Sequence, residues 1–165
     1  MSVNWKELSG WASVQGQWLR RRHFNAEMLG HLAEQIRKGE ENHSGELVVA
    51  IEAVLPAHEA DSAQRALEVF GRLRVWDTPL NSGVLLYLAL GQRRIHIIAD
   101  RGIKADQAQW TQICQQLEKD LASREYLSGL LAAVSAIETV LQQGAPAQTP
   151  GVAAVNALPD EPVLL

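Results

Sequence analysis

Polar side chains that could do chemistry gather in three short segments, each beside an apolar stretch of the chain. They are Ser44 and Glu46, then Asp77, Thr78, Asn81 and Ser82, and then Asp100 and Arg101. Carboxylate, amide, hydroxyl and loop carbonyl oxygens are the ligands that hard divalent cations such as Ca²⁺ and Mg²⁺ prefer. Carboxylates held close together would also suit proton transfer or metal-assisted hydrolysis. The same residue types form turns and helix caps, so the residues alone leave a purely structural interpretation open.

The elements beside these segments predict that all three meet at one edge of a β-sheet. Residues 46–54 and 83–90 are almost entirely apolar, which is typical of strands buried on both faces. Residues 62–73 lie between them with apolar side chains at helical spacing, so the two strands should be parallel, with a right-handed crossover. A turn of two residues then leads into residues 93–100, which predicts an antiparallel hairpin. The first two strands therefore start, and the third ends, at the same edge.

Three further segments repeat apolar side chains at helical spacing and should pack against this sheet. The first begins after Asn25, whose side chain is expected to cap it. The second begins at Asp106, which has capping-box spacing with Gln109, and Ser123 is expected to cap the third. The order of elements, α-β-α-β-β-α-α, predicts an α/β fold. We expect a three-layer α/β/α sandwich, with a small mixed sheet and helices on both faces.

The segment before this domain, residues 1–23, is rich in tryptophan and arginine. It includes Trp5, Trp11 and Trp18, followed by the basic run Arg20, Arg21 and Arg22. Its apolar positions recur at helical spacing, which predicts a short amphipathic helix. Such a helix could lie on an anionic membrane surface or contact a membrane-associated partner. It could equally pack on its own domain and leave the arginines in water.

The chain has 165 residues, the length of one domain, and we place that domain at residues 24–143. From residue 144 onward Ala, Pro, Gln, Thr and Gly replace the regular apolar pattern. This composition predicts a flexible C-terminal tail over residues 144–165. No apolar stretch has the ~20 residues of a membrane-spanning helix. The first residues also lack the apolar core of a signal peptide, so we expect a cytoplasmic protein.

Composition excludes several classes of protein. Fifteen Lys and Arg against nineteen Asp and Glu give a formal net charge of −4, which disfavours a nucleic-acid-binding protein. The single cysteine, Cys114, excludes an intramolecular disulfide, and its place in an apolar helical stripe predicts a buried, unreactive thiol. The histidines lack the spacing of zinc ligands, and His96 should be a half-exposed strand residue. Nucleotide-binding glycine loops and serine-hydrolase motifs are absent from the sequence.

Three blocks of sequence resemble the TPM-domain family, the thylakoid-lumen-phosphatase-like proteins. They are residues 43–49 (HSGELVV), 78–88 (TPLNSGVLLYL) and 93–103 (RRIHIIADRGI). Over residues 24–143 the chain is most similar to a short bacterial subgroup without signal peptide or membrane span. That subgroup also has a leader rich in tryptophan and arginine, and a tail that resembles residues 155–161 (VNALPDE). The resemblance implies an α/β/α sandwich with a groove for Ca²⁺ or Mg²⁺ at the loop edge described above.

Carried over residue by residue, the resemblance also implies a set of metal ligands. They are Glu46, Asn81 and Asp100, with Asp77, Thr78 and Ser82 as secondary candidates. Family members with an Asp-Asn-Gly motif have Asp where this chain has Asn81, so one carboxylate is missing from the implied site. Some members are credited with acid phosphatase activity, and others maintain membrane complexes or modulate receptors.

Three functions follow from these observations. The first, which we favour, is a non-catalytic binding module that binds Ca²⁺ or Mg²⁺ at the loop edge and engages a membrane-associated protein. The second is a divalent-metal-dependent phosphatase, with Glu46 and Asp100 as ligands and Asn81 or Ser82 orienting the substrate. The third is a structural interaction domain without a ligand. The sequence identifies no catalytic residue.

Overall fold

A mixed sheet of four strands forms the centre of the molecule in the computed structural model, which describes residues 11–148 and 156–165. The strands are β1 (Glu46–Glu52), β2 (Gly83–Ala89), β3 (Arg94–Ala99) and β4 (Val163–Leu164). They lie in the order β3-β2-β1-β4, with β1 parallel to both β2 and β4 and with β2 antiparallel to β3. The predicted βαβ unit and the hairpin after it are therefore confirmed.

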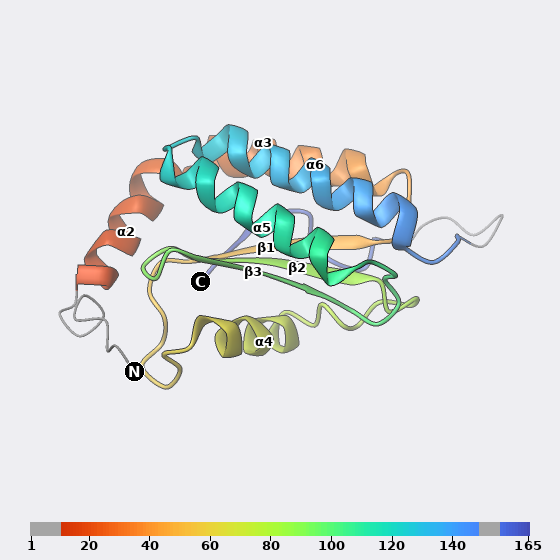
Figure 1. The fold of residues 1–165 in the computed structure, drawn as a ribbon, viewed down its shortest axis with the longest axis horizontal. Helices are drawn as coiled ribbons and strands as arrows, with labels where there is room; N and C mark the ends of the chain where they lie inside the picture. Colours follow the sequence, from red (N-terminus) through yellow and green to blue (C-terminus); the bar gives the residue numbers. More distant parts are fainter. Residues whose placement is uncertain (1–10, 149–155) are drawn as a thin grey trace.

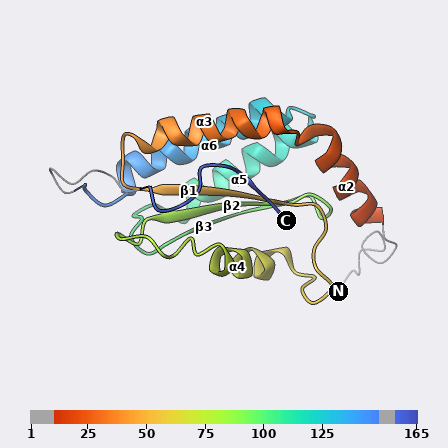
Figure 2. The ribbon, with the colours of Figure 1, turned by 180° about the vertical axis from the view of Figure 1, so that it is seen from behind.

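Helices cover both faces of this sheet. They are α2 (Trp11–His23), α3 (Ala26–Glu40), α4 (Ser62–Arg72), α5 (Gln107–Ala122) and α6 (Tyr126–Gly144). Figure 1 shows α3, α5 and α6 on one face and α4 on the other, and Figure 2 shows the same layers from behind. The predicted three-layer α/β/α sandwich with a mixed sheet is confirmed.

Most of the predicted helices begin at the capping residue that the sequence indicates. The Asn25 side chain accepts the backbone N–H of Met28 at 2.9 Å, and Asp106 forms a capping box with Gln109. The prediction for the last helix is wrong, because Ser123 is the C-cap of α5 and α6 begins only at Tyr126. The chain needs Ser123 to Glu125 to reverse direction between these two helices, which pack side by side (Figure 1).

The two hydrophobic clusters follow the alternation of side chains along the strands. Leu47, Val49 and Ile51 of β1 join the cluster under α3, α5 and α6. Val48 and Ala50 point to the other face and pack with α4. All seven residues of β1 and of β2 are buried, as their almost entirely apolar pattern predicts.

The C-terminal segment differs from its prediction. The sequence predicts a flexible tail over residues 144–165, whereas residues 156–165 lie along the outer edge of β1. Ala50 pairs with Val163, and the N–H of Leu165 donates to the carbonyl of Ile51 at 2.9 Å. An edge strand presents unpaired backbone groups, and a strand of two residues is enough to satisfy some of them. Such a short strand leaves no periodic pattern in the sequence.

The leader helix packs on its own domain through one side. Gly16 is buried so closely that a methyl group there would lie 1.8 Å from the carbonyl oxygen of Ala53. Leu19 contacts the main hydrophobic cluster, and Arg20 donates to the carbonyl of Leu165 at 3.2 Å. Trp5 lies outside the described residues, and of Trp11 only the backbone is described. Within the described ranges no helix is long and apolar enough to cross a membrane.

Candidate functional site

The three polar segments singled out in the sequence meet at one edge of the sheet. The N–H of Glu46 donates to the carbonyl of Ser82 at 3.0 Å, and the N–H of Asp100 donates to the carbonyl of Gly83 at 2.9 Å. The N–H of Gly102 completes the set by donating to the carbonyl of Asn81 at 2.8 Å. The sheet topology thus brings the backbones of these segments together, and the side chains decide what the edge can bind.

The three secondary candidates all have partners within or beside the loop. Thr78 Oγ1 accepts the N–H of Ser82 at 2.8 Å, and Ser82 Oγ donates to the carbonyl of Ser44 at 2.7 Å. Both side chains are buried. Asp77 is exposed and forms an ion pair with Arg74 at 2.5 Å. These contacts make the three residues loop-forming residues in the structure.

Glu46 is directed toward the C-terminal segment. Its Oε2 accepts the backbone N–H groups of Ala157, at 3.0 Å, and Leu158, at 2.6 Å. Glu46 is buried, and this burial raises the pKa of its carboxyl although the two hydrogen bonds act in the opposite direction. The structure therefore gives this carboxylate protein partners that the sequence analysis did not foresee.

Glu46 and Asp100 are separated by the strand between them. Glu46 pairs with Gly83 in the sheet, and Asp100 hydrogen-bonds to Gly83 from the other side. The space above Gly83 is filled by the chain at Val75, because a methyl group on Gly83 would lie 1.9 Å from the Val75 carbonyl oxygen. The carboxylates implied as two ligands of one ion are thus not brought together in this structure.

Asp100 is the candidate whose carboxylate keeps a free oxygen. Its Oδ1 accepts the N–H of Arg101 at 2.7 Å, while its Oδ2 is buried and has no hydrogen-bond partner among the described residues. Asn81 lies in the same turn with a left-handed backbone, at φ 53°, and its Oδ1 accepts a hydrogen bond from the Arg101 guanidinium at 3.3 Å. Across the described ranges, no group of three or more His, Cys, Asp or Glu side chains is placed to hold a metal ion.

A cluster of buried and half-buried titratable side chains behind this edge was missed in the sequence. Glu40 at the end of α3 accepts the N–H of Leu47 at 2.8 Å, and burial raises the pKa of its carboxyl to about 8. Glu138 of α6 hydrogen-bonds to His43, and both of these side chains are buried. In the sequence Glu40 resembles any exposed residue at a helix end, so only the packing distinguishes it.

A second buried polar group lies on the α4 face. Arg65 donates two hydrogen bonds to the carboxylate of Glu52, at 2.8 and 3.0 Å, and Tyr87 donates a third to the same carboxylate. The side chains of Arg65 and Glu52 are 4% and 5% exposed. The one indication of this group in the sequence is Glu52 itself, a glutamate at the end of an apolar strand. A carboxylate buried there needs a polar partner.

The expectation for His96 agrees with the structure, and that for Cys114 differs in its burial. Cys114 is partly buried, and burial raises the pKa of its thiol to about 11, so the thiol stays protonated at neutral pH. His96 is half-buried on β3, and its Nε2 lies 2.8 Å from the hydroxyl of Ser62. Burial lowers the pKa of this imidazole.

Comparisons with known proteins agree with this architecture. The structure is similar to the NMR structure of the BA42 protein from the psychrophilic bacterium Bizionia argentinensis, with a TM-score of 0.72 and 25% sequence identity. The match covers 85% of this chain and 94% of that one. No curated protein matches the sequence. The family model described as the TPM domain matches residues 22–140, and the chain therefore belongs to the TPM domain family.

Proposed function

We propose that this protein is a non-catalytic binding module whose loop edge binds Ca²⁺ or Mg²⁺ through Asp100. The observation that carries the proposal is the buried Oδ2 of Asp100, which has no partner in the described parts of the chain. A buried carboxylate oxygen without a partner is costly, and a divalent cation would satisfy it. The amide oxygen of Asn81 and the loop carbonyls nearby are further hard ligands of the kind these ions take.

The expected affinity is low. Glu46 already accepts two backbone N–H groups and Asp77 pairs with Arg74, so Asp100 is left as the one carboxylate of the implied ligand set with a free oxygen among the described residues. Arg101 places a positive charge beside the same turn, with its guanidinium on Asn81. Calcium sites with few charged ligands have dissociation constants of about 10⁻⁴ to 10⁻³ M. We therefore expect the site to be occupied only when the cation is present at millimolar concentration.

Thermal unfolding with and without cation tests this site. About 10 mM CaCl₂ or MgCl₂ should raise the unfolding temperature of the wild-type protein, because a ligand that binds only the folded state stabilises it. Asp100→Asn should abolish this shift, whereas Glu46→Gln, the matched control at the same edge, should keep it. A shift that survives in Asp100→Asn, or no shift in the wild type, contradicts the proposal. The latter result favours a domain without a ligand at this edge.

A metal-dependent phosphatase remains the second candidate, since it would use the same edge. Hydrolysis of p-nitrophenyl phosphate in the presence of Mg²⁺ separates the two functions. The binding-module proposal expects no rate above that of buffer with metal. Turnover by the wild type that Asp100→Asn removes would replace the proposal with the phosphatase.

We also propose that α2 is the surface that meets a membrane-associated protein. Val14 and Trp18 are 67% and 53% exposed on this helix, and Arg21 and Arg22 beside them are exposed as well. Arg20, the first arginine of the basic run, is not counted in this surface because its guanidinium donates to the carbonyl of Leu165. Exposed apolar side chains next to a basic run suit a partner surface that is apolar and acidic.

Sedimentation with membrane vesicles from the source cells tests this surface. The protein should sediment with untreated vesicles and not with vesicles whose proteins have been digested. A Val14→Ser, Trp18→Ser double variant should lose the association, and Leu67→Ser on α4, another exposed apolar residue, should keep it. Undiminished binding to digested vesicles would mean that α2 binds lipid and not a protein.

A further inference from the structure

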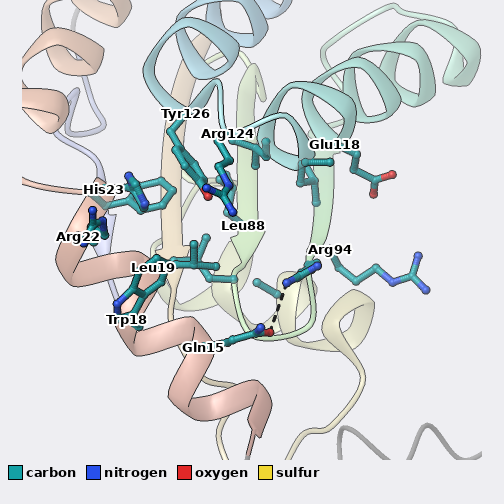
Figure 3. A pocket seen from close by; sticks show the side chains of 17 residues that line it. Gln15, Trp18, Leu19, Arg22, His23, Leu88, Arg94, Glu118, Arg124 and Tyr126 are labelled. Atoms are coloured by element: carbon teal, nitrogen blue, oxygen red, sulfur yellow. Dashed lines mark hydrogen bonds between the residues drawn. The ribbon is translucent and has the colours of Figure 1, made fainter.

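A pocket of about 820 Å³ lies at the opposite end of the sheet from Asp100. It is formed by α2, the ends of β2 and β3, and the turn between α5 and α6. Figure 3 shows Arg124 and Tyr126 entering it from the α5–α6 turn, with Leu19 and Gln15 of α2 on the other side. A volume of roughly 300–1,000 Å³ is usual for a site that holds a small molecule.

Arginines line this pocket without acidic partners. Arg22, Arg93 and Arg124 belong to three different elements, and none of them lies within 4.0 Å of a carboxylate in the described ranges. Two of them contact uncharged side chains. The Arg22 guanidinium lies over the Trp18 ring, 5.4 Å from its centroid, and the Arg93 guanidinium donates a hydrogen bond to Gln15 Oε1 at 3.4 Å. Among the described residues of the lining Glu118 is the one acidic side chain, and Figure 3 shows it pointing away from Arg124.

Two of these arginines occupy backbone positions that favour glycine. Arg124 follows the C-cap of α5 at φ 66°, and Arg93 closes the hairpin turn at φ 54°. Both positions are usually taken by glycine because other residues are strained there. Arg74 has a similar backbone, at φ 55°, but pairs with Asp77. Strained residues are concentrated at functional sites, and here two of them bring to one pocket guanidinium groups that have no carboxylate partner in the described ranges.

The wall next to the arginines is aromatic. The rings of His23 and Tyr126 stack with centroids 4.1 Å apart and planes 21° apart, and Trp18 meets His23 edge-on at 5.7 Å. Burial lowers the pKa of His23, and the charges of Arg22 and Arg124 lower it further. These effects favour the neutral imidazole, and the positive charge beside this wall belongs to the arginines.

We propose that this pocket binds a small organic anion that has a planar apolar body. The body would lie against the aromatic wall of Trp18, His23 and Tyr126. Its carboxylate or phosphate would be held by Arg124, with Arg22 and Arg93 beside it. A guanidinium group donates two parallel hydrogen bonds to either kind of anion. This site is independent of the cation site at Asp100, which lies at the other end of the strands.

Amide-resolved NMR titration with 2-naphthoate tests the pocket, and 2-naphthamide serves as its neutral counterpart. Naphthoate should shift the amides of residues 18–24, 88–95 and 121–126, and naphthamide should bind about tenfold more weakly, since it lacks the charge-assisted hydrogen bonds. Arg124→Gln and Arg93→Gln should each weaken naphthoate binding severalfold. Arg72→Gln, which changes an exposed arginine of α4 outside the pocket lining, should leave it unchanged.

Three results would overturn the proposal. They are equal affinity for naphthoate and naphthamide, shifts that lie away from the pocket, and unchanged affinity in Arg124→Gln. A lipid headgroup is the other source of such an anion, so phosphatidylglycerol vesicles form the second arm of the experiment. Binding to vesicles that depends on Arg21 as much as on Arg124 would assign the arginines to a membrane-facing surface and would also reject the pocket.

Discussion

Glu46 Oε2 lies 2.6 Å from the backbone nitrogen of Leu158, which joins the first residue of β1 to a segment 112 residues further along the chain. The same oxygen accepts the N–H of Ala157. Together with the pairing of β1 and β4, this contact fixes the C-terminal segment on the sheet edge. Glu46 therefore acts as an anchor for that segment.

Removal of this anchor should release the segment. Glu46→Ala leaves two backbone N–H groups without an acceptor, and a buried unsatisfied group costs about 1–3 kcal/mol. The free energy of unfolding should fall by that order, and the amide of Leu158 should lose its protection from hydrogen exchange. Glu46→Gln keeps an oxygen acceptor and should retain most of the protection. Unchanged exchange at Leu158 in Glu46→Ala contradicts this role.

Glu40 should make the protein less stable as the pH rises. Burial raises the pKa of its carboxyl in the folded protein to about 8, above the ordinary value of 4.5. The folded state then holds a proton that the unfolded chain releases. The stabilising contribution is therefore complete below pH 4.5 and is lost as the pH rises through 8, with a slope of at most about 1.4 kcal/mol per pH unit.

Urea unfolding at several pH values between 4.5 and 8 measures this contribution. Glu40→Gln keeps an acceptor for the Leu47 N–H and cannot ionise, so the variant should match the wild type near pH 4.5 and exceed its stability near pH 8. Glu41→Gln, an exposed neighbour, serves as the control and should follow the wild type. Parallel curves for Glu40→Gln and the wild type would show that Glu40 ionises normally.

The ion pair between Arg65 and Glu52 should behave as a buried one. Arg65→Met leaves the Glu52 carboxylate buried with Tyr87 as its remaining donor, and breaking such a pair costs about 3–5 kcal/mol. The double variant Arg65→Met, Glu52→Gln should recover part of this loss, because it removes the unpaired charge. Arg37→Met breaks an exposed pair with Glu34 and should leave the stability unchanged. Equal effects of Arg65→Met and Arg37→Met in urea unfolding would contradict the assignment.

Much of the fold could be predicted from local sequence patterns. Each of these patterns lies within a short stretch of chain, and the structure agrees with them. They are the almost entirely apolar runs of β1 and β2 and the helix caps at Asn25 and Asp106. The contacts that were missed join distant residues. Nothing near Glu46 in the sequence indicates that Leu158 will lie beside it, and the sequence placed Glu46 with Asp100 because it could not show how Val75 covers Gly83.

The hairpin turn and the pocket were missed for a related reason. The sequence predicts a two-residue turn, whereas Ala89 pairs with Arg94 and leaves residues 90–93 in the loop. The left-handed backbone at Arg93 was not foreseen because arginine is not a residue that favours it. The pocket needs α2, this turn and the α5–α6 turn together, so no single segment of the sequence indicates it.

Arg124 should lower the stability of the protein through its backbone. Its φ of 66° is unfavourable for a residue with a side chain, at a cost of roughly 1–2 kcal/mol, and glycine avoids that cost. Arg124→Gly should therefore raise the free energy of unfolding, by less than the full amount because glycine also makes the unfolded chain more flexible. Arg21→Gly, in the helical backbone of α2, should lower it. Urea unfolding of both variants checks the sign, and a loss of stability in Arg124→Gly would refute the prediction.

An amide-resolved NMR titration with Ca²⁺ tests the proposed cation site most directly. We predict shifts at residues 78–83 and 100–102 with a midpoint of about 1 mM, and no comparable shifts at Glu46 or Leu158, whose hydrogen bond should persist. Asp100→Asn should remove the response. Silence at residues 100–102, or shifts centred on Glu46 and Leu158, would contradict a site at Asp100.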